Sequence, residues 1–235
     1  MEKVERRIEV VEEHVEHDYA AVEMDEAKIA EREHRRFVGG RWHEIGTLQR
    51  DYLVSRGLQP GHALLDVGCG ALRAGRHFVS YLEPNGYYGI DINPTLIEAG
   101  WNVELDDEQR AKLPLSNLRS TDRFDADFGV QFDMAIANSV FTHVSLNHMR
   151  LALFRLSKVM RSGGEFYATY FERDDDFPLD GVFGKVPKQR FYERNVFWYY
   201  RRDMEWVSSD MPFEAIHIGD WGHPRNQQMM LYKRL

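Results

Sequence analysis

Two short runs combine acidic residues with glycines in a way that could bind a nucleoside. Asp66 precedes the closely spaced Gly68 and Gly70, and Asp91 follows 21 residues after Gly70. Glycines permit a tight turn and a close approach of the backbone to a ligand. An acidic residue at the spacing of Asp91 is typical of the group that accepts hydrogen bonds from ribose hydroxyls in nucleotide-binding sheets.

The glycine run does not suit a dinucleotide. A dinucleotide fingerprint reads G-x-G-x-x-G, and Arg73 occupies the position of its third glycine, where its side chain fills the space that a pyrophosphate needs. Asp66, two residues before the first glycine, would repel a phosphate and suits a cation. We therefore expect a positively charged nucleoside ligand that has a ribose and no essential pyrophosphate.

The elements that must position these residues are strands alternating with helices. From residue 41 onward, strand patterns occur at residues 62–67, 87–92, 117–120, 132–137 and 165–171, and helical patterns at residues 42–56, 72–82 and 145–160. Asn93 and Pro94 predict the start of a further helix and Gly100 predicts its end. The alternation predicts a mainly parallel sheet covered on both faces. Such sheets bind ligands at the carboxyl ends of their strands, where residues 66–70 and Asp91 then lie.

Residues 1–36 differ from the rest of the chain and predict one long, charged helix. No glycine or proline interrupts them, and apolar residues repeat at Ile8, Val15, Val22 and Ile29. The second apolar row that a coiled coil needs is incomplete, because Asp18 and Asp25 fall in it. Three interpretations remain open: a helix lying on its own domain, an arm that forms a homo-oligomer, or a lid over a site.

A hinge is predicted after this helix, at Gly39 and Gly40. We therefore divide the chain into a charged helical extension at residues 1–40 and a main domain at residues 41–235.

Length and charge restrict the classes of function. The chain has 235 residues, a formal net charge of −8 and one cysteine, Cys69. One cysteine excludes a disulfide scaffold and a zinc site built on cysteines. The acidic balance disfavours a nucleic-acid partner, and no run of about 18 apolar residues predicts a membrane span. We expect a cytoplasmic protein with no membrane partner.

Four segments resemble the motifs of a known family. They are LLDVGCG at residues 64–70, GIDI at residues 89–92, FDMAIAN at residues 132–138 and MRSGGEF at residues 160–166. In order and spacing they are similar to the class I S-adenosylmethionine-dependent methyltransferases over residues 42–172. The resemblance implies a Rossmann-like, seven-stranded, mainly parallel sheet, S-adenosyl-L-methionine as the cofactor, and methyl transfer as the reaction.

The resemblance also implies which residues contact the cofactor. The methionine part would lie against Asp66, Gly68, Cys69, Gly70 and Asn138. Asp91 would accept hydrogen bonds from both ribose hydroxyls, and Ile92 would pack on the adenine.

The other side of the adenine would be flanked by Asp122, Arg123 and Phe124, with Asp125 and Asp127 near enough to exchange roles with them. Trp42, in the helix before the first motif, would close over the cofactor.

Three residues are candidates for handling the methyl acceptor. A hydroxyl acceptor needs a base, and His143, which follows the fourth strand, is the first candidate; a structural role at a helix start is the alternative. Glu172 ends the fifth strand with Arg173 and would face either the acceptor or a solvated loop. Arg73 would either hold an anionic acceptor or secure a loop.

The acceptor itself is expected to be a small molecule such as a sugar, a glycan end or a secondary metabolite, methylated at oxygen or, less favoured, at nitrogen. His223 and Arg225, between predicted strands at residues 213–218 and 227–232, are secondary candidates for binding it. A metal is not expected, because Asn138 stands at the strand end where metal-dependent relatives carry a carboxylate. The alternatives are a protein or peptide methyltransferase and a non-catalytic cofactor-binding partner protein.

Overall fold

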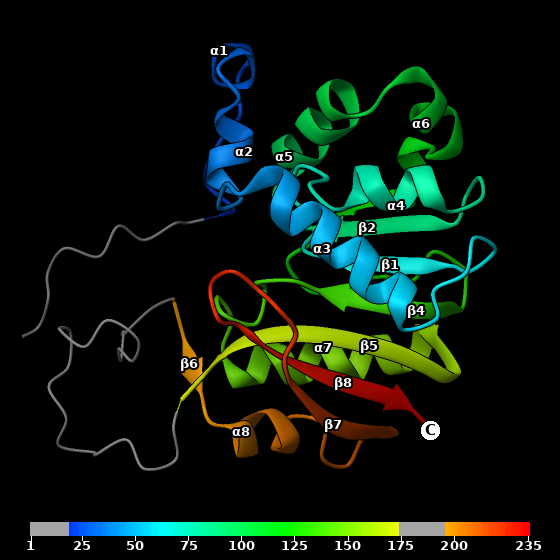
Figure 1. The fold of residues 1–235 in the computed structure, drawn as a ribbon, viewed down its shortest axis with the longest axis vertical. Helices are drawn as coiled ribbons and strands as arrows, with labels where there is room; N and C mark the ends of the chain where they lie inside the picture. The colour runs from blue at the N-terminus through cyan, green and yellow to red at the C-terminus, as the bar shows by residue number, and fades with distance from the viewer. Residues whose placement is uncertain (1–18, 174–195) are drawn as a thin grey trace, which may run out of the picture.

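A single twisted sheet forms the centre of the molecule (Figure 1). The computed structural model describes residues 19–173 and 196–235. The strands are β1 (Leu64–Val67), β2 (Tyr87–Asp91), β3 (Leu118–Ser120), β4 (Phe132–Ala137), β5 (Met160–Glu172), β6 (Trp198–Tyr199), β7 (Phe213–Asp220) and β8 (Gln228–Arg234). Seven of them follow the order β3-β2-β1-β4-β5-β8-β7, and the short β6 pairs with β5.

The sheet is mainly parallel. Strands β1 to β5 pair in parallel, while β8 runs antiparallel to both β5 and β7. The predicted Rossmann-like architecture is therefore confirmed, with β6 as a two-residue addition. The register of β1 aligns Val67 with Ile90 of β2 and Asp66 with Ile136 of β4. It brings the residues that follow these three strands to one edge of the sheet.

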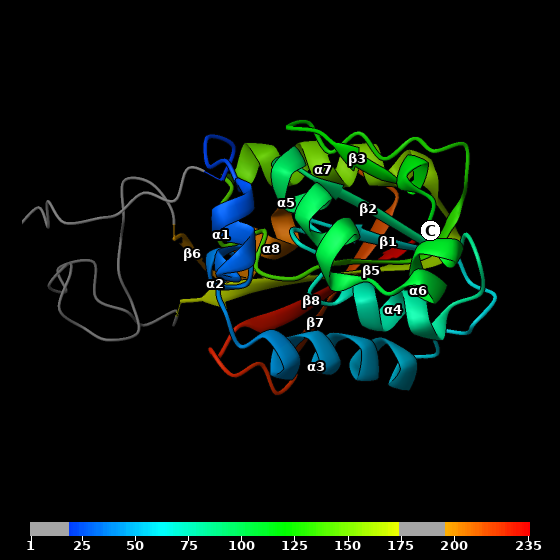
Figure 2. The ribbon, with the colours of Figure 1, turned by 90° about the horizontal axis from the view of Figure 1, so that it is seen from above.

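Helices cover both faces, as Figure 2 shows for α7 on one side and α3 and α4 on the other. The helices of the main domain are α3 (Trp42–Ser55), α4 (Gly75–Tyr81), α5 (Pro94–Ala99), α6 (Asp107–Lys112), α7 (Leu146–Val159) and α8 (Arg201–Trp206). Leu53 of α3 and Phe78 of α4 pack into one apolar core, and Leu153 of α7 and Met204 of α8 into the other. Alternate side chains of the buried strands enter the two cores, as both faces of a covered sheet require.

Helix α5 begins where Asn93 and Pro94 predict it and ends at Ala99 with Gly100 as its C-cap, but the chain does not turn away at this glycine. The Asn93 side chain caps the helix by accepting from the backbone N–H groups of Thr95 and Leu96. Gly100 has φ −59° and continues directly into a π-helix, Gly100–Glu104. A Cβ at Gly100 would lie 2.6 Å from the carbonyl carbon of Ala71. Glycine is therefore needed here for close packing and not for a turn.

The prediction of one continuous helix over residues 1–36 is wrong for residues 19–36; residues 1–18 lie outside the described part of the chain. Two short helices occur instead, α1 (Glu26–Ala30) and α2 (Glu33–Phe37), and Arg32 between them is in the left-handed region with φ 61°. Val22 and Ile29 pack against a buried cluster that contains Trp42. The segment thus lies on the main domain, and we call residues 19–40 the cap.

Within the described ranges, no helix has both the length and the apolar character needed to cross a membrane.

Candidate functional site

A cavity of about 560 Å³ opens at the carboxyl edge of β1, β2 and β4. The wall includes most of the residues selected from the sequence: Asp66, Gly68, Cys69, Gly70, Arg73, Asp91, Ile92, Asp122, Phe124, Asn138 and His143. The cap contributes Tyr19, Ala20, Val38 and Gly39, and the connection between β7 and β8 contributes Arg225. Segments that are far apart in the sequence therefore enclose one space.

Some selected residues do not line this cavity: Asp125, Asp127, Arg173 and His223 among the secondary candidates, and Trp42, Arg123 and Glu172 among the main ones. Trp42 is buried beside Ala71 and Leu96, with the Arg35 guanidinium 5.0 Å from its ring centroid. It supports the cap and is not positioned to close over a ligand. Arg123 is exposed, and its backbone N–H donates to Thr121 Oγ1.

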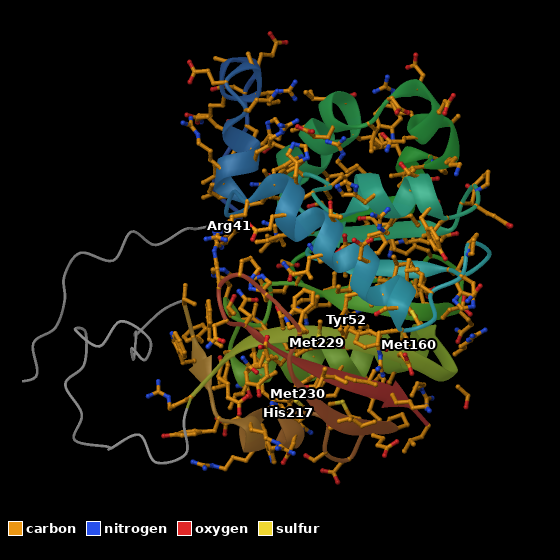
Figure 3. The ribbon with its side chains drawn as sticks, viewed as in Figure 1. Arg41, Tyr52, Met160, His217, Met229 and Met230 are labelled. Atoms are coloured by element: carbon orange, nitrogen blue, oxygen red, sulfur yellow. The ribbon has the colours of Figure 1, made fainter. Side chains whose placement is uncertain are left out.

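Glu172 is also outside the cavity, in a small cluster on the far part of the sheet. Its carboxylate accepts hydrogen bonds from Tyr170 at 2.7 Å and contacts His217 Nε2 at 2.8 Å. His217 lies well away from Arg41, which marks the cap side of the molecule (Figure 3). Glu172 is thus not brought to the space that His143 lines.

The glycine loop has a backbone geometry that other residues could hardly adopt. Gly68 has φ +74° and Gly70 has φ +51°, both in the left-handed region. A Cβ at Gly68 would collide with Val140 Cγ2, and one at Gly70 would lie 2.9 Å from Val38 Cγ1. The backbone N–H groups of Gly68 and Cys69 both donate to the carbonyl of Ile90, which ties the loop to β2.

Asp91, at the end of β2, is hydrogen-bonded to the glycine loop. Its Oδ2 accepts from the Gly70 backbone N–H at 2.8 Å, and its Oδ1 accepts from the Asn93 N–H at 2.9 Å. Burial raises the pKa of Asp91, while hydrogen bonds from the backbone of Asn93, Gly70 and Ile92 oppose that effect. Ile92, just beyond it, is 41% exposed and forms the rim of the cavity.

Asp66 is the second buried carboxyl group in the cavity wall. Burial raises the pKa of Asp66 to about 7, although the Tyr87 hydroxyl, which donates to Asp66 Oδ2 at 2.8 Å, lowers it. The charge of Asp91 contributes to this raised pKa. Ionising Asp66 in this buried position is costly. A cation bound beside it would favour the charged carboxylate.

Tyr19 of the cap meets His143 in the wall of the same cavity. The Tyr19 hydroxyl lies 3.4 Å from His143 Nε2, and the two rings pack edge to face with centroids 4.9 Å apart. A tight turn after β4 positions the histidine, because its N–H donates to the Val140 carbonyl. Burial raises the pKa of Tyr19, partly opposed by the charge of Arg225, so the phenol keeps its proton.

The cap is held over the cavity by side chains that donate to its backbone carbonyls. Asn93 Nδ2 donates to the carbonyls of Tyr19 and Val22, both at 2.7 Å. Arg73 Nη1 donates to the carbonyls of Val38 at 2.9 Å and Gly40 at 3.1 Å. These bonds fix the part of the cap that lines the cavity.

A buried carboxylate anchors the helices of the cap. Glu104, at the end of the π-helix, accepts from His34 Nε2 and from Arg35 Nε and Nη2, each at 2.7 Å, and from Arg32 at 3.1 Å. Burial alone would raise the pKa of Glu104, but the hydrogen bonds from Arg35 and His34 hold it below its ordinary value. π-helical turns often occur near functional sites, and this one directs Glu104 into the cap.

Sequence reasoning missed Tyr19, Tyr87 and Glu104. Tyr87 opens a strand and reads as an ordinary core residue. Tyr19 reaches the cavity only because the cap folds back over the sheet, and no local pattern marks that contact. The cluster of basic residues at 32–36 was the one available signal for a buried acidic partner such as Glu104.

Comparisons with known proteins agree with the fold and the motifs. Residues 65–166 match the family model described as a methyltransferase domain. The sugar N-methyltransferase KedS8 from a Streptoalloteichus species is 17% identical with a TM-score of 0.63, over 97% of this chain and 99% of that one.

Two further solved structures have the same fold. CalS10 from Micromonospora echinaspora, an amino pentose methyltransferase, is 17% identical with a TM-score of 0.60, over 90% of this chain and 98% of that one. The magnesium protoporphyrin IX methyltransferase ChlM from Synechocystis is 15% identical with a TM-score of 0.57, over 81% of each chain.

The family match over residues 65–166, the fold and the motifs together support a class I S-adenosylmethionine-dependent methyltransferase. The resemblance predicted from the four segments is thereby confirmed, with S-adenosyl-L-methionine as the cofactor of this class.

Proposed function

We propose that this enzyme transfers a methyl group from S-adenosyl-L-methionine to a hydroxyl oxygen of a small molecule such as a sugar, a glycan end or a secondary metabolite. The observation that carries the proposal is one continuous cavity that joins Asp66 and Asp91 to His143. The cofactor end and a candidate base therefore share a single space that the cap partly covers.

The residues present fit the cofactor. The loop at Gly68 and Gly70 lines the cavity, and a Cβ on either glycine would press against Val140 or Val38 in the same wall. Asn138 Oδ1 is buried and has no hydrogen-bond partner within the described part of the chain, although Asn138 lines the cavity. Together with Asp66, this acceptor suits the ammonium of the methionine part, since both groups attract donors with a positive charge.

The adenosine part would lie at the β2 end of the cavity. Asp91 keeps acceptor capacity for the ribose hydroxyls, because each carboxylate oxygen uses one of its lone pairs for the bonds from Gly70 and Asn93. Ile92 and Phe124 offer apolar surface to the adenine, and Asp122 lies beside them in the wall.

When bound, the cofactor supplies an activated methyl group on a sulfonium. The chain has to align the acceptor oxygen at about 3–3.5 Å from that carbon and to exclude water. Tyr19 and the rest of the cap provide the exclusion. His143 would accept the proton that the acceptor hydroxyl releases, and the Tyr19 ring packed against the imidazole would hold it in position.

An amino nitrogen is the second candidate acceptor. The named activities of KedS8 and CalS10, which match this chain over nearly their whole length, favour it. A neutral amine attacks through its own lone pair and loses its proton afterwards. Such an acceptor would depend less on His143.

The experiment is an assay of methyl transfer from labelled S-adenosyl-L-methionine to a matched panel of hydroxy sugars and amino sugars. We expect transfer to at least one hydroxyl acceptor and dependence of that transfer on His143. Transfer to amino sugars alone would replace the oxygen proposal by the nitrogen one. Cofactor binding without transfer to any small molecule, but with transfer to a protein, would contradict both.

A further inference from the structure

Two arginines from distant parts of the chain meet in the cavity wall. Arg73 follows the glycine loop, and Arg225 belongs to the connection between β7 and β8. Arg225 Nη2 donates to the carbonyl of Gly39, while Arg73 donates to the carbonyls on either side, those of Val38 and Gly40. The two guanidinium groups thus contact three consecutive residues of the cap.

The close approach of Arg225 depends on Gly39. This glycine has φ +91°, and a Cβ on it would lie 2.8 Å from Arg225 Nη1. Gly39 was predicted as a hinge, and in the folded chain it is also the residue against which Arg225 packs.

No acidic side chain of the described residues is hydrogen-bonded to either guanidinium group, although the charge of Asp66 acts on Arg73. Within the described ranges, neither Arg73 nor Arg225 forms an ion pair, and their three described acceptors are neutral carbonyls. Arg73 is 92% buried, since only 8% of its surface is exposed. Burial, together with the charge of Arg225, lowers the pKa of Arg73 to about 10. A buried charge without a partner is costly, so an anion bound here would be favoured.

The remaining titratable groups around the pair do not supply that anion. His223 is buried beside them, and burial together with the charges of Arg73 and Arg225 lowers its pKa to about 4, so the ring stays neutral. Tyr19 keeps its proton. Asp66 is close enough to Arg73 for each charge to shift the pKa of the other, yet Asp66 accepts its described hydrogen bond from Tyr87.

We propose that Arg73 and Arg225 bind a carboxylate in the cavity, namely the α-carboxylate of the cofactor's methionine part. This assignment rests on the proposed function. An α-amino acid carries its ammonium and its carboxylate on one carbon, and here an acidic side chain, Asp66, stands beside two basic ones. Arginine suits the carboxylate because its planar donors match both oxygens. Arg73 is then a cofactor-binding residue and not a grip for the acceptor.

The test compares two ligands that differ only in this group. Calorimetry measures binding of S-adenosyl-L-methionine and of its decarboxylated form, which keeps the ammonium, to the unmodified chain and to Arg225→Ala. We expect Arg225→Ala to weaken the carboxylate ligand by about tenfold or more. The decarboxylated ligand is expected to bind both proteins within about threefold. Arg225→Lys keeps the charge and should restore part of the lost affinity.

Arg41→Ala is the matched control. Arg41 lies at the beginning of α3 (Figure 3), is exposed, pairs with Glu44 and does not line the cavity. We expect it to bind both ligands like the unmodified chain.

The outcomes separate this inference from the proposed function. Failure of the unmodified chain to bind S-adenosyl-L-methionine would contradict the proposed function itself. Normal binding by the unmodified chain with an equal loss of both ligands in Arg225→Ala would mean that Arg225 only holds the cap, and would overturn the carboxylate assignment. Unchanged binding of both ligands would overturn it as well. A melting curve checks that each variant is folded.

Discussion

The backbone N–H of Gly70 donates a hydrogen bond of 2.8 Å to the carboxylate of Asp91. This bond closes the glycine loop against the end of β2. The residue proposed to bind ribose therefore also shapes the loop proposed to hold methionine. One side chain therefore preorganises both halves of the proposed cofactor site, which would reduce the conformational entropy that binding has to overcome.

Replacement of Asp91 by alanine tests this double role. Asp91→Ala removes the acceptor of the ribose hydroxyls and leaves the N–H groups of Gly70 and Asn93 without their described partner. We expect cofactor binding to weaken by about 1–3 kcal/mol and the melting temperature to fall. Calorimetry and thermal unfolding measure the two effects. Unchanged affinity would show that Asp91 does not contact the cofactor.

His143→Ala tests the base. We expect turnover of a hydroxyl acceptor to fall by about 10²–10⁴-fold, because the hydroxyl proton loses its acceptor. Cofactor affinity should stay within about threefold of normal, because His143 is proposed to contact the methyl acceptor and not the cofactor. Steady-state kinetics and cofactor titration give both values. A fall in turnover of less than about threefold would leave His143 structural.

Tyr19→Phe is the companion variant. It keeps the aromatic contact with His143 and removes the hydroxyl that lies 3.4 Å from Nε2. The loss of one neutral hydrogen bond is worth about 0.5–1.5 kcal/mol, so we expect a smaller fall in turnover than in His143→Ala. The fall should be greatly reduced when His143 is already replaced, because the two side chains act together. Additive losses in the double variant would contradict that coupling.

The raised pKa of Asp66 leads us to expect that the stability of the cofactor-free protein depends on pH. Burial raises the pKa of Asp66 from 3.8 to about 7, so between these values the folded protein holds a proton that the unfolded chain releases. The contribution of Asp66 to the free energy of unfolding therefore falls as the pH rises from about 4 to about 7. Denaturant unfolding at several pH values measures the slope.

Asp66→Asn is the control for that dependence. The amide has the same shape and no titration, so the variant should show a flatter dependence of stability on pH over the same window. It should also bind the cofactor more weakly, because the ammonium loses a charged partner. An identical pH slope in both proteins would show that Asp66 does not titrate in this range.

Glu104→Gln tests the anchor of the cap. The variant removes the charge that His34 and Arg35 contact at 2.7 Å. We expect a loss of about 1–3 kcal/mol in unfolding free energy, faster hydrogen exchange in the cap, and weaker cofactor binding. Glu33→Gln is the matched control, since Glu33 pairs with Arg36 at the surface, where such a pair contributes about 0–1 kcal/mol. Equal exchange rates in the cap of both variants would contradict the anchoring role.

The sheet and the cofactor end of the cavity were predictable because their signals are local. Strand ends, the glycine loop and Asp91 follow from alternation and spacing, and the parallel register then brings them together. The cap was not predictable in this way. Val22 and Ile29 repeat as in a helix, yet the break at Arg32 is compensated by contacts with Glu104, about 70 residues away in the sequence.

Two further differences have the same origin. Trp42 has the aromatic character of a residue that covers a ligand, but packing against Arg35 and Ala71 turns it into the core. Gly100 resembles a helix terminator, but Ala71 requires a residue without a Cβ at that point. In each case a tertiary contact overrides what the local sequence indicates.

The π-helix at Gly100–Glu104 could lose a residue and remain helical, yet the cap over the cavity would lose its anchor. Its wider turn holds one residue more than an α-helical turn, so deleting a single residue there would still allow regular helical hydrogen bonds. The deletion would nevertheless rotate the following side chains by about 100°, and Glu104 would no longer point towards Arg35. A one-residue gap at this place in a related sequence would therefore indicate a protein with the same core whose cap is not anchored by this glutamate.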